Sequence, residues 1–400
     1  MPFSLARRAS EITYAIREFV PLALELERKG LRVIYLNIGD PLKYDFDTPR
    51  PVKEALYEAV VEGHNYYSLS EGDVELREAI AERERRVNGA NVSPSDVIVT
   101  QGVSEAIDFT FAISIDLGDE VLLPGPSYPL YPVVVRIYGG KPVFYKCDES
   151  NEWAPDVDDV RKKVTEKTKA IVIINPNNPT GAVYSERVVK ELLDLAAEHD
   201  ILVISDEIYD RIVFEGVFKS VASLAKDVTT IIFNGFSKVY LMTGWRLGYL
   251  YVMSPKEEVK ERIINALRNM ARTRLCASTP VQRAAIVALK VVNEHISRVV
   301  GKLKERSDYV YKRLSEVPGV EVVRPKGAFY IFPKIPRSKA WHSDREFALR
   351  LLREEHVLVV HGSGFGEYGE SHFRSVTLPP MDILEEAFNR IERFIIKYTK

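Results

Sequence analysis

Short apolar runs rich in β-branched residues alternate with longer amphipathic runs between about Asp96 and Met253, and this alternation constrains the fold more than any other feature. It predicts βα units that build a mainly parallel sheet sandwiched by helices, in a large α/β domain. The predicted strands are 97–100, 120–123, 142–145, 170–174, 201–205, 229–233 and 249–253. The helices predicted between them include 104–114, 156–164 and 185–199.

The pattern changes after about Val281. Long charged helices are predicted around 294–315 and 383–398, with short strands at 320–323 and 329–332. We expect these elements to form a smaller α+β domain. This domain is discontinuous, because residues 1–46 are expected to return and pack against residues 286–400, whereas the large domain spans 47–285.

The composition indicates a globular chain with a large core and no attraction to polyanions. Of its 400 residues, 46% are hydrophobic, and 55 basic against 57 acidic side chains give a net charge of -2. Nucleic acid and membrane are therefore not expected as partners. No apolar run approaches the roughly 18 residues that would span a bilayer, and the start of the chain does not resemble a signal peptide. Cys147 and Cys276 show no disulfide or metal-binding spacing, so a cytoplasmic location is expected.

Polar and glycine-containing motifs follow five of the predicted strands. Open α/β sheets bind ligands outside the carboxyl ends of their strands, so these motifs are expected to share one site. In chain order they are Gly102-Val103-Ser104, Tyr128, Asn178, Asp206 and Lys238.

The residue types at this edge match the chemical needs of pyridoxal phosphate. An amine held among apolar walls, as expected for Lys238, stays partly neutral and can bond to an aldehyde. Asp206 would pair with a protonated ring nitrogen, and Tyr209 would donate to the ring oxygen. The helix that opens at Ser104 and the guanidinium of Arg246 would hold the phosphate. Together these groups satisfy all four requirements of the cofactor.

Each residue also has a structural alternative. Ser104 and Asp206 would serve equally well as helix caps, and a single lysine such as Lys238 is usually a solvated surface residue. The glycine-rich segment 361–366 has GxGxG spacing with no helix after it, so a dinucleotide site is not predicted. His356, His361 and His372 lack the helical spacing of metal ligands, and no metal site is expected.

These motifs together resemble the class I aminotransferases of the fold-type I pyridoxal phosphate enzymes, from about Leu36 to Ile395. The resemblance is carried by SK…GWRLG from Ser237, SDEIY from Ser205 and NPNNPTG from Asn175. It implies that Lys238 carries the cofactor, and that the phosphate, ring nitrogen and ring oxygen are held by Arg246, Asp206, Tyr209 and Asn178.

The resemblance implies further contacts as well. Tyr128 would place its ring over the cofactor, and Tyr67 of a neighbouring subunit would reach the phosphate, which implies a homodimer with shared active sites. Gly39, Asn178 and Arg374 would bind the substrate. Arg374 would hold the α-carboxylate.

One departure from the family pattern affects the phosphate site. Some members have a serine where this chain has Gly235, so Ser237 is expected to contribute to phosphate binding instead. Segments 64–68, 327–334 and 361–380 are most similar to alanine aminotransferases.

The resemblance implies transfer of the amino group of an L-amino acid, alanine, to 2-oxoglutarate by a ping-pong mechanism, giving pyruvate and glutamate. An aspartate or broad-specificity aminotransferase is the first alternative. A β-lyase and a non-catalytic module that keeps the cofactor are alternatives of other classes. A dicarboxylate substrate would need a second cation, for which Arg272 and Arg274 are candidates, although each also suits a surface or interface ion pair.

Overall fold

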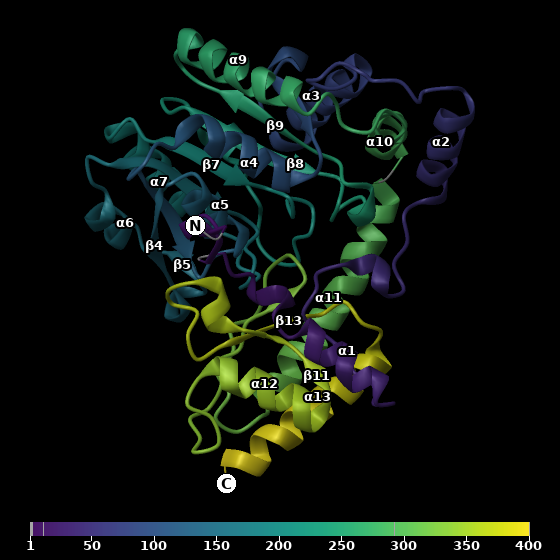
Figure 1. Cartoon of the computed structure of the whole chain (residues 1–400), viewed down its shortest axis with the longest axis vertical. Coiled ribbons are helices and arrows are strands. Elements are labelled where there is room, and N and C mark those ends of the chain that lie inside the picture. Colours follow the sequence, from purple (N-terminus) through teal and green to yellow (C-terminus); the bar gives the residue numbers. More distant parts are fainter. Residues whose placement is uncertain (1–2, 11, 292, 400) are drawn as a thin grey trace.

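A central sheet organises the computed structural model, which describes residues 3–10, 12–291 and 293–399 (Figure 1). Within these residues the sheet has eight strands in the order β2-β9-β8-β7-β6-β3-β4-β5. Neighbouring strands from β8 to β4 are parallel, whereas β9 is antiparallel to both of its neighbours and β5 is antiparallel to β4. The predicted α/β fold with a mainly parallel sheet is confirmed. The strands are β2 (Val97–Thr100), β3 (Glu120–Gly125), β4 (Lys141–Asp148), β5 (Ala154–Pro155), β6 (Thr168–Ile174), β7 (Leu202–Asp206), β8 (Thr230–Gly235) and β9 (Gly248–Met253).

Alternate residues of the central strands face two helical layers. In β6, Val172 and Ile174 join the core beneath one set of helices, whereas Ile171 and Ile173 join the core beneath the other. Because both faces are covered, these strands are apolar on both sides, as is usual for parallel sheets. The first layer contains α4 (Val103–Ser114), α5 (Leu130–Ile137) and α9 (Glu257–Thr273), and the second contains α6 (Val157–Lys163), α7 (Glu186–Glu198) and α8 (Val221–Leu224).

Three more helices pack together at one end of this sheet. The helix α10 contacts both α2 and α3, and α3 also shares a core with β2 and β9. These helices are α2 (Arg50–Val61), α3 (Val74–Asn88) and α10 (Thr279–Val291).

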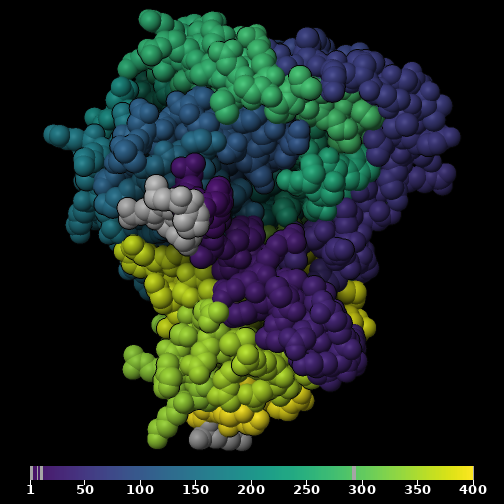
Figure 2. All heavy atoms as spheres, in the orientation of Figure 1, coloured from purple at the N-terminus to yellow at the C-terminus, as the bar shows by residue number. Residues whose placement is uncertain are grey.

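The remaining elements form the lower part of the view in Figure 1. They include α1 (Val20–Arg28), α11 (Asn293–Ser315), α12 (Asp344–Glu355) and α13 (Met381–Thr399). A small sheet has the order β10-β13-β12, and β1 pairs in parallel with β11. This pairing returns the N-terminal segment to the C-terminal part of the chain, and Figure 2 shows that purple segment lying where the upper and lower parts meet. The strands are β1 (Ile34–Tyr35), β10 (Tyr330–Ile331), β11 (Val357–Leu358), β12 (Val360–His361) and β13 (Phe373–Val376).

One sequence prediction about this part is wrong. The strand expected at 320–323 does not form, and a single bridge joins Glu321 to Lys334 instead. The N–H of Lys334 donates to the carbonyl of Glu321, whereas the carbonyl of Pro333 faces the other way and accepts from the N–H of Phe373. The strand expected at 329–332 is present but shorter, at Tyr330–Ile331. No helix in the described ranges has the length and apolar content needed to cross a membrane.

Candidate active site

A cavity of about 520 Å³ lies at the carboxyl ends of the parallel strands. Its walls come from the large sheet, from the N-terminal segment and from β10 and β13. Most residues that the sequence predicts for the site line this one cavity: Gly39, Val103, Ser104, Tyr128, Asn178, Asp206, Tyr209, Ser237, Lys238, Arg246 and Arg374.

Asp206 ends the buried strand β7 and is only 4% exposed. One carboxylate oxygen accepts a hydrogen bond from the hydroxyl of Tyr131 at 2.8 Å, and the other accepts from the backbone N–H of Ile208 at 3.2 Å. Burial raises the pKa of Asp206 to about 6. No described cation lies within ion-pair distance of it, so a positively charged ligand atom would stabilise the ionised form.

Lys238 follows β8 and reaches the cavity from a turn. Its Nζ donates to the carbonyl oxygen of Gly39 at 2.6 Å and lies 5.5 Å from the ring centre of Phe329. Desolvation lowers the pKa of Lys238 to about 8, and the positive charges of Arg374 and Arg246 act in the same direction. More of the amine is therefore neutral at neutral pH than in a free lysine, which makes it a better nucleophile and base.

The helix α4 begins at Val103 and directs its first backbone N–H groups toward an anion-binding position. Gly102, with φ of +76°, precedes it and provides no side-chain cap. A Cβ at Gly102 would lie 2.5 Å from Nη2 of Arg246 and would push the guanidinium away, and the positive φ disfavours any residue other than glycine. The guanidinium of Arg246 donates to the carbonyl of Thr243 at 3.0 Å and lies 3.5 Å from Oγ of Ser237. It has no carboxylate partner among the described residues, so the site can hold a phosphate.

Arg374, on β13, is a second cation without a described carboxylate partner, and it is only 1% exposed. Its guanidinium lies 4.5 Å from the ring centre of Tyr330 and 5.0 Å from that of Phe365. It donates to Oδ1 of Asn178 at 2.9 Å and to the carbonyl of Asn37, whereas its Nε has no partner. Burial lowers the pKa of Arg374, but a guanidinium stays protonated in proteins. A buried cation that lacks a counter-ion is poised to bind a carboxylate.

Paired tyrosines complete the walls. The hydroxyl of Tyr209 lies 2.8 Å from that of Tyr330, and the hydroxyl of Tyr128 lies 3.0 Å from that of Tyr14. The backbone of Gly39 passes so close to the hydroxyl of Tyr330 that a Cβ there would collide with it. The cavity is thus narrow beside Lys238.

Two polar wall residues that precede α1 were not predicted from the sequence. Tyr14 and Arg17 both line the cavity. The guanidinium of Arg17 makes no hydrogen bond or ion pair with any residue in the described ranges. No motif marks this segment, and the only sequence signal is an arginine close to two aromatic residues, Tyr14 and Phe19.

Four predicted residues do not line this cavity in the single chain: Gly102, which lies against Arg246, and Tyr67, Arg272 and Arg274. Tyr67 is 78% exposed and does not line it. Arg274 donates to both carboxylate oxygens of Glu105 at 3.1 Å and to two backbone carbonyls, so its fork is already occupied. Arg272 is exposed and lies 3.8 Å from Glu71. Arg17, rather than Arg272 or Arg274, lines the cavity in addition to Arg246 and Arg374.

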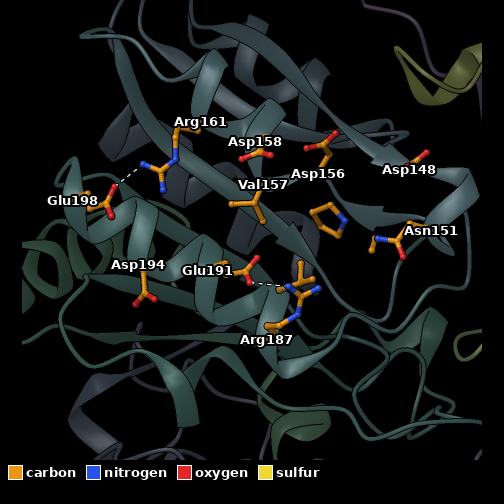
Figure 3. A pocket seen from close by; sticks show the side chains of 13 residues that line it. Asp148, Asn151, Asp156, Val157, Asp158, Arg161, Arg187, Glu191, Asp194 and Glu198 are labelled. Carbon is orange, nitrogen blue, oxygen red and sulfur yellow. Dashed lines mark hydrogen bonds and ion pairs between the residues drawn. The ribbon is translucent and has the colours of Figure 1, made fainter.

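A surface groove of about 560 Å³ between α6 and α7 is a poorer candidate (Figure 3). Six of its 13 lining residues are acidic. The two arginines in it are already paired, Arg161 with Glu198 at 2.8 Å and Arg187 with Glu191 at 3.1 Å. It therefore offers no free cation or amine among the described residues. Nor does any cluster of three or more potential metal ligands occur in the described ranges.

Comparisons with known proteins agree with this geometry. A glutamate-pyruvate aminotransferase, AlaA, from Haemophilus influenzae is 40% identical over 404 residues, which cover 99% of each chain. An aromatic-amino-acid aminotransferase from Thermococcus litoralis is 39% identical over 385 residues, 95% of each chain. The solved structure of an alanine aminotransferase from Pyrococcus furiosus has a TM-score of 0.96 and 53% identity, covering 98% of this chain and 100% of that one.

This likeness confirms the predicted fold, because it extends over nearly the whole chain. The family model of aminotransferase class I and II matches residues 32–391. The resemblance inferred from the motifs around Lys238 and Asp206 is therefore confirmed. The chain belongs to the aminotransferase class I and II family.

Proposed function

We propose that this aminotransferase uses pyridoxal phosphate to transfer the amino group of L-alanine to 2-oxoglutarate, giving pyruvate and glutamate. The observation that carries the proposal is the electrostatic setting of Lys238. Its amine lies in one cavity with the buried carboxylate of Asp206 and with two arginines, Arg246 and Arg374, that have no described carboxylate partner. This set matches a cofactor with an aldehyde, a ring nitrogen and a phosphate, next to a substrate carboxylate.

The residues present fit the cofactor. The N-terminus of α4 and Arg246, with Ser237 beside it, would hold the phosphate. Asp206, whose ionised form lacks a described counter-ion, would pair with the protonated ring nitrogen. Tyr209 and Asn178 would donate to the ring oxygen, and the ring of Tyr128 would cover the ring. When bound, pyridoxal phosphate supplies an electron sink for the negative charge left at Cα of the amino acid.

The chain's own residues provide binding and proton transfer. Arg374 binds the α-carboxylate of the amino acid and so fixes the direction of its Cα–H bond. The Nζ of Lys238 removes the proton from Cα, a role that suits a pKa near 8 because an effective base titrates close to the working pH. The nearby rings of Tyr330 and Phe329 exclude water from this position.

We infer that Arg17 binds the distal carboxylate of 2-oxoglutarate and of glutamate. It lines the cavity and has no described partner, and carboxylate is the group that an arginine fork binds best. Alanine has no distal carboxylate, so it needs only Arg374. The two substrates would therefore share one binding mode and differ only in their use of Arg17.

We propose a homodimer in which Tyr67 of each subunit reaches the phosphate of the other. A patch on α2 and the following loop supports this proposal, because its large side chains are between 54% and 78% exposed. They are Tyr57, Val61, Tyr66, Tyr67 and Leu69. Several large apolar side chains exposed within one short segment are typical of an interface.

The proposal also includes the domain limits 47–285 and 1–46 with 286–400, and a cytoplasmic location. The pairing of Ile34 with Val357 supports the discontinuous small domain, because it joins the N-terminal segment to the C-terminal part of the chain. The free thiols of Cys147 and Cys276 support the cytoplasmic location, since reduced cysteines are usual in the cytoplasm.

An amino-donor panel with 2-oxoglutarate as acceptor tests the function. With saturating pyridoxal phosphate, we expect alanine to give pyruvate and glutamate with a higher kcat/KM than aspartate. Related small amino acids should show some activity, because a pocket discriminates one methylene by only about 1–3 kcal/mol. An aspartate kcat/KM clearly above that of alanine would contradict the alanine assignment. Release of ammonia from cysteine without an acceptor would instead indicate a β-lyase, and no product from any donor would indicate a non-catalytic module.

A further inference from the structure

A buried ion network lies beside the turns that carry the catalytic groups. It centres on Arg83 of α3, which forms ion pairs with the neighbouring Glu84 and with Asp210. These three charged residues are only 2%, 0% and 4% exposed, respectively. None of them lines the cavity, so the network does not touch cofactor or substrate.

Neutral donors saturate Glu84, whereas Oδ1 of Asp210 and Nε of Arg83 have no partner. Glu84 accepts hydrogen bonds from the hydroxyls of Tyr249 and Tyr251 at 2.6 and 3.0 Å, and from Nδ2 of Asn88 at 2.7 Å. The same Asn88 also donates to Asp210 at 3.2 Å. Glu84 therefore has a donor for each of its acceptor directions, and its position is tightly defined.

The network joins two separate segments of the active site. Asp210 directly follows Tyr209, and it accepts from Nδ2 of Asn234 at 3.1 Å. Asn234 lies in β8, four residues before Lys238, and its Oδ1 accepts from the next backbone N–H at 2.7 Å. Arg83 thus holds, through Asp210 and Asn234, both the turn that carries Tyr209 and the strand that leads to Lys238.

Stability alone does not account for such a network. Replacing buried ion pairs with well-packed apolar residues is often neutral or stabilising, because desolvation of the charges offsets their attraction. What hydrogen-bonded charges provide, and apolar packing does not, is a defined distance and direction between the elements that they join.

We propose that Arg83 is a positioning residue for the cofactor site. It fixes the segment before Lys238 relative to residues 206–210, so that the amine of Lys238, the carboxylate of Asp206 and the hydroxyl of Tyr209 keep their mutual geometry. This inference rests on the proposed function, because it assigns Arg83 a role in holding the pyridoxal phosphate site.

The test compares Arg83→Lys with Arg306→Lys. Lysine keeps the charge but has no fork, so it holds one of the two carboxylates at a time. Arg306 is a matched control because it is 3% exposed, binds the carbonyl of Leu378 and Asp45 at once, and does not line the cavity. Three quantities are measured for each protein: the melting temperature, the Kd of the apoprotein for pyridoxal phosphate, and the pH midpoint of the bound cofactor's visible absorbance.

We expect both variants to melt earlier, but only Arg83→Lys to weaken cofactor binding, by about tenfold to 100-fold, and to shift the absorbance midpoint. Equal Kd and midpoint in Arg83→Lys and wild type, with only the melting temperature lowered, would overturn the proposal. If Arg83→Lys does not fold, Asp210→Asn decides by the same two readouts, because it removes the charge that Arg83 binds and keeps an acceptor for Asn234. Failure of the wild type to bind pyridoxal phosphate would instead refute the proposed function.

Discussion

Glu207 should make the stability of this protein fall as the pH rises. It lies next to Asp206 but is absent from the cavity wall, and it is only 1% exposed. One carboxyl oxygen accepts from Oγ of Ser205 and from the backbone N–H of Val221, both at 2.9 Å, whereas the other has no partner. Burial raises the pKa of Glu207 to about 8, and the negative charge of Glu84 adds to this effect. The carboxyl group is therefore protonated in the folded protein at neutral pH.

The sign and size of the effect follow from proton linkage. Below its ordinary pKa of 4.5, Glu207 is protonated in both states. Between that pH and about 8 only the folded state keeps the proton, so stability is lost as the pH rises. The whole pKa shift corresponds to about 5 kcal/mol in the free energy of unfolding. About 3 kcal/mol of this is lost between roughly pH 6 and pH 9.

Glu207→Gln should remove this dependence. Glutamine is neutral at every pH and its Oε1 keeps both acceptor roles, so the variant should gain about 3 kcal/mol relative to wild type between roughly pH 6 and pH 9. Guanidinium chloride unfolding at both pH values measures the difference, with all proteins at one concentration because the proposed dimer makes stability concentration-dependent. Glu82→Gln is the control, since Glu82 is exposed on α3. The reasoning is refuted if the stability difference between Glu207→Gln and wild type is the same at both pH values.

Three further predictions concern the active site directly. Lys238→Ala should lose several orders of magnitude in turnover and all borohydride-fixable cofactor. Mass spectrometry that still finds covalently fixed cofactor would assign the attachment to another residue. Arg374→Lys keeps the charge but loses the fork, so kcat/KM for alanine should fall by about 100-fold while the cofactor spectrum persists. An unchanged kcat/KM would remove Arg374 from the substrate site. Arg17→Gln should raise KM for 2-oxoglutarate and leave KM for pyruvate near its wild-type value, and an equal change in both steady-state values would exclude the distal-carboxylate role.

The sheet was predictable because its signal is local. Buried parallel strands are continuous apolar runs, and the prediction for β2 matches Val97–Thr100. The predicted ends of the strands were less accurate. The strand β4 was expected at 142–145 but spans Lys141–Asp148, and its last residues were missed because they alternate between partly buried and buried positions instead of forming an apolar run. Only pairing with the neighbouring strands β3 and β5 reveals that extension. Similarly, the residues at 320–323 do not by themselves show that the facing segment makes a single bridge to them, between Glu321 and Lys334.

Local sequence signals also explain which site residues were predicted and which were missed. Asp206 and Lys238 were predicted because each follows an apolar strand, and this position places it at the carboxyl edge of the sheet. Tyr14, by contrast, reaches the cavity through a contact with Tyr128 that is 114 residues away in the chain. Arg17 on the same segment carries no local pattern, so only the folded chain identifies it as a wall of the cavity.

Substrate choice should depend on the N-terminal segment, because the catalytic groups and the proposed side-chain contact come from different parts of the chain. The groups that perform proton transfer and hold the cofactor come from strand ends of the large sheet, whereas Arg17 comes from the N-terminal segment. Curated relatives named for alanine and for aromatic amino acids have the same overall identity to this chain, 39%, whereas the solved alanine aminotransferase from Pyrococcus furiosus is 53% identical. These identity values do not say which residues select the amino donor. Exchanging the segment around Tyr14 and Arg17 should change the relative kcat/KM of donors, while the spectrum of the bound cofactor, which depends on Asp206 and Lys238, stays the same.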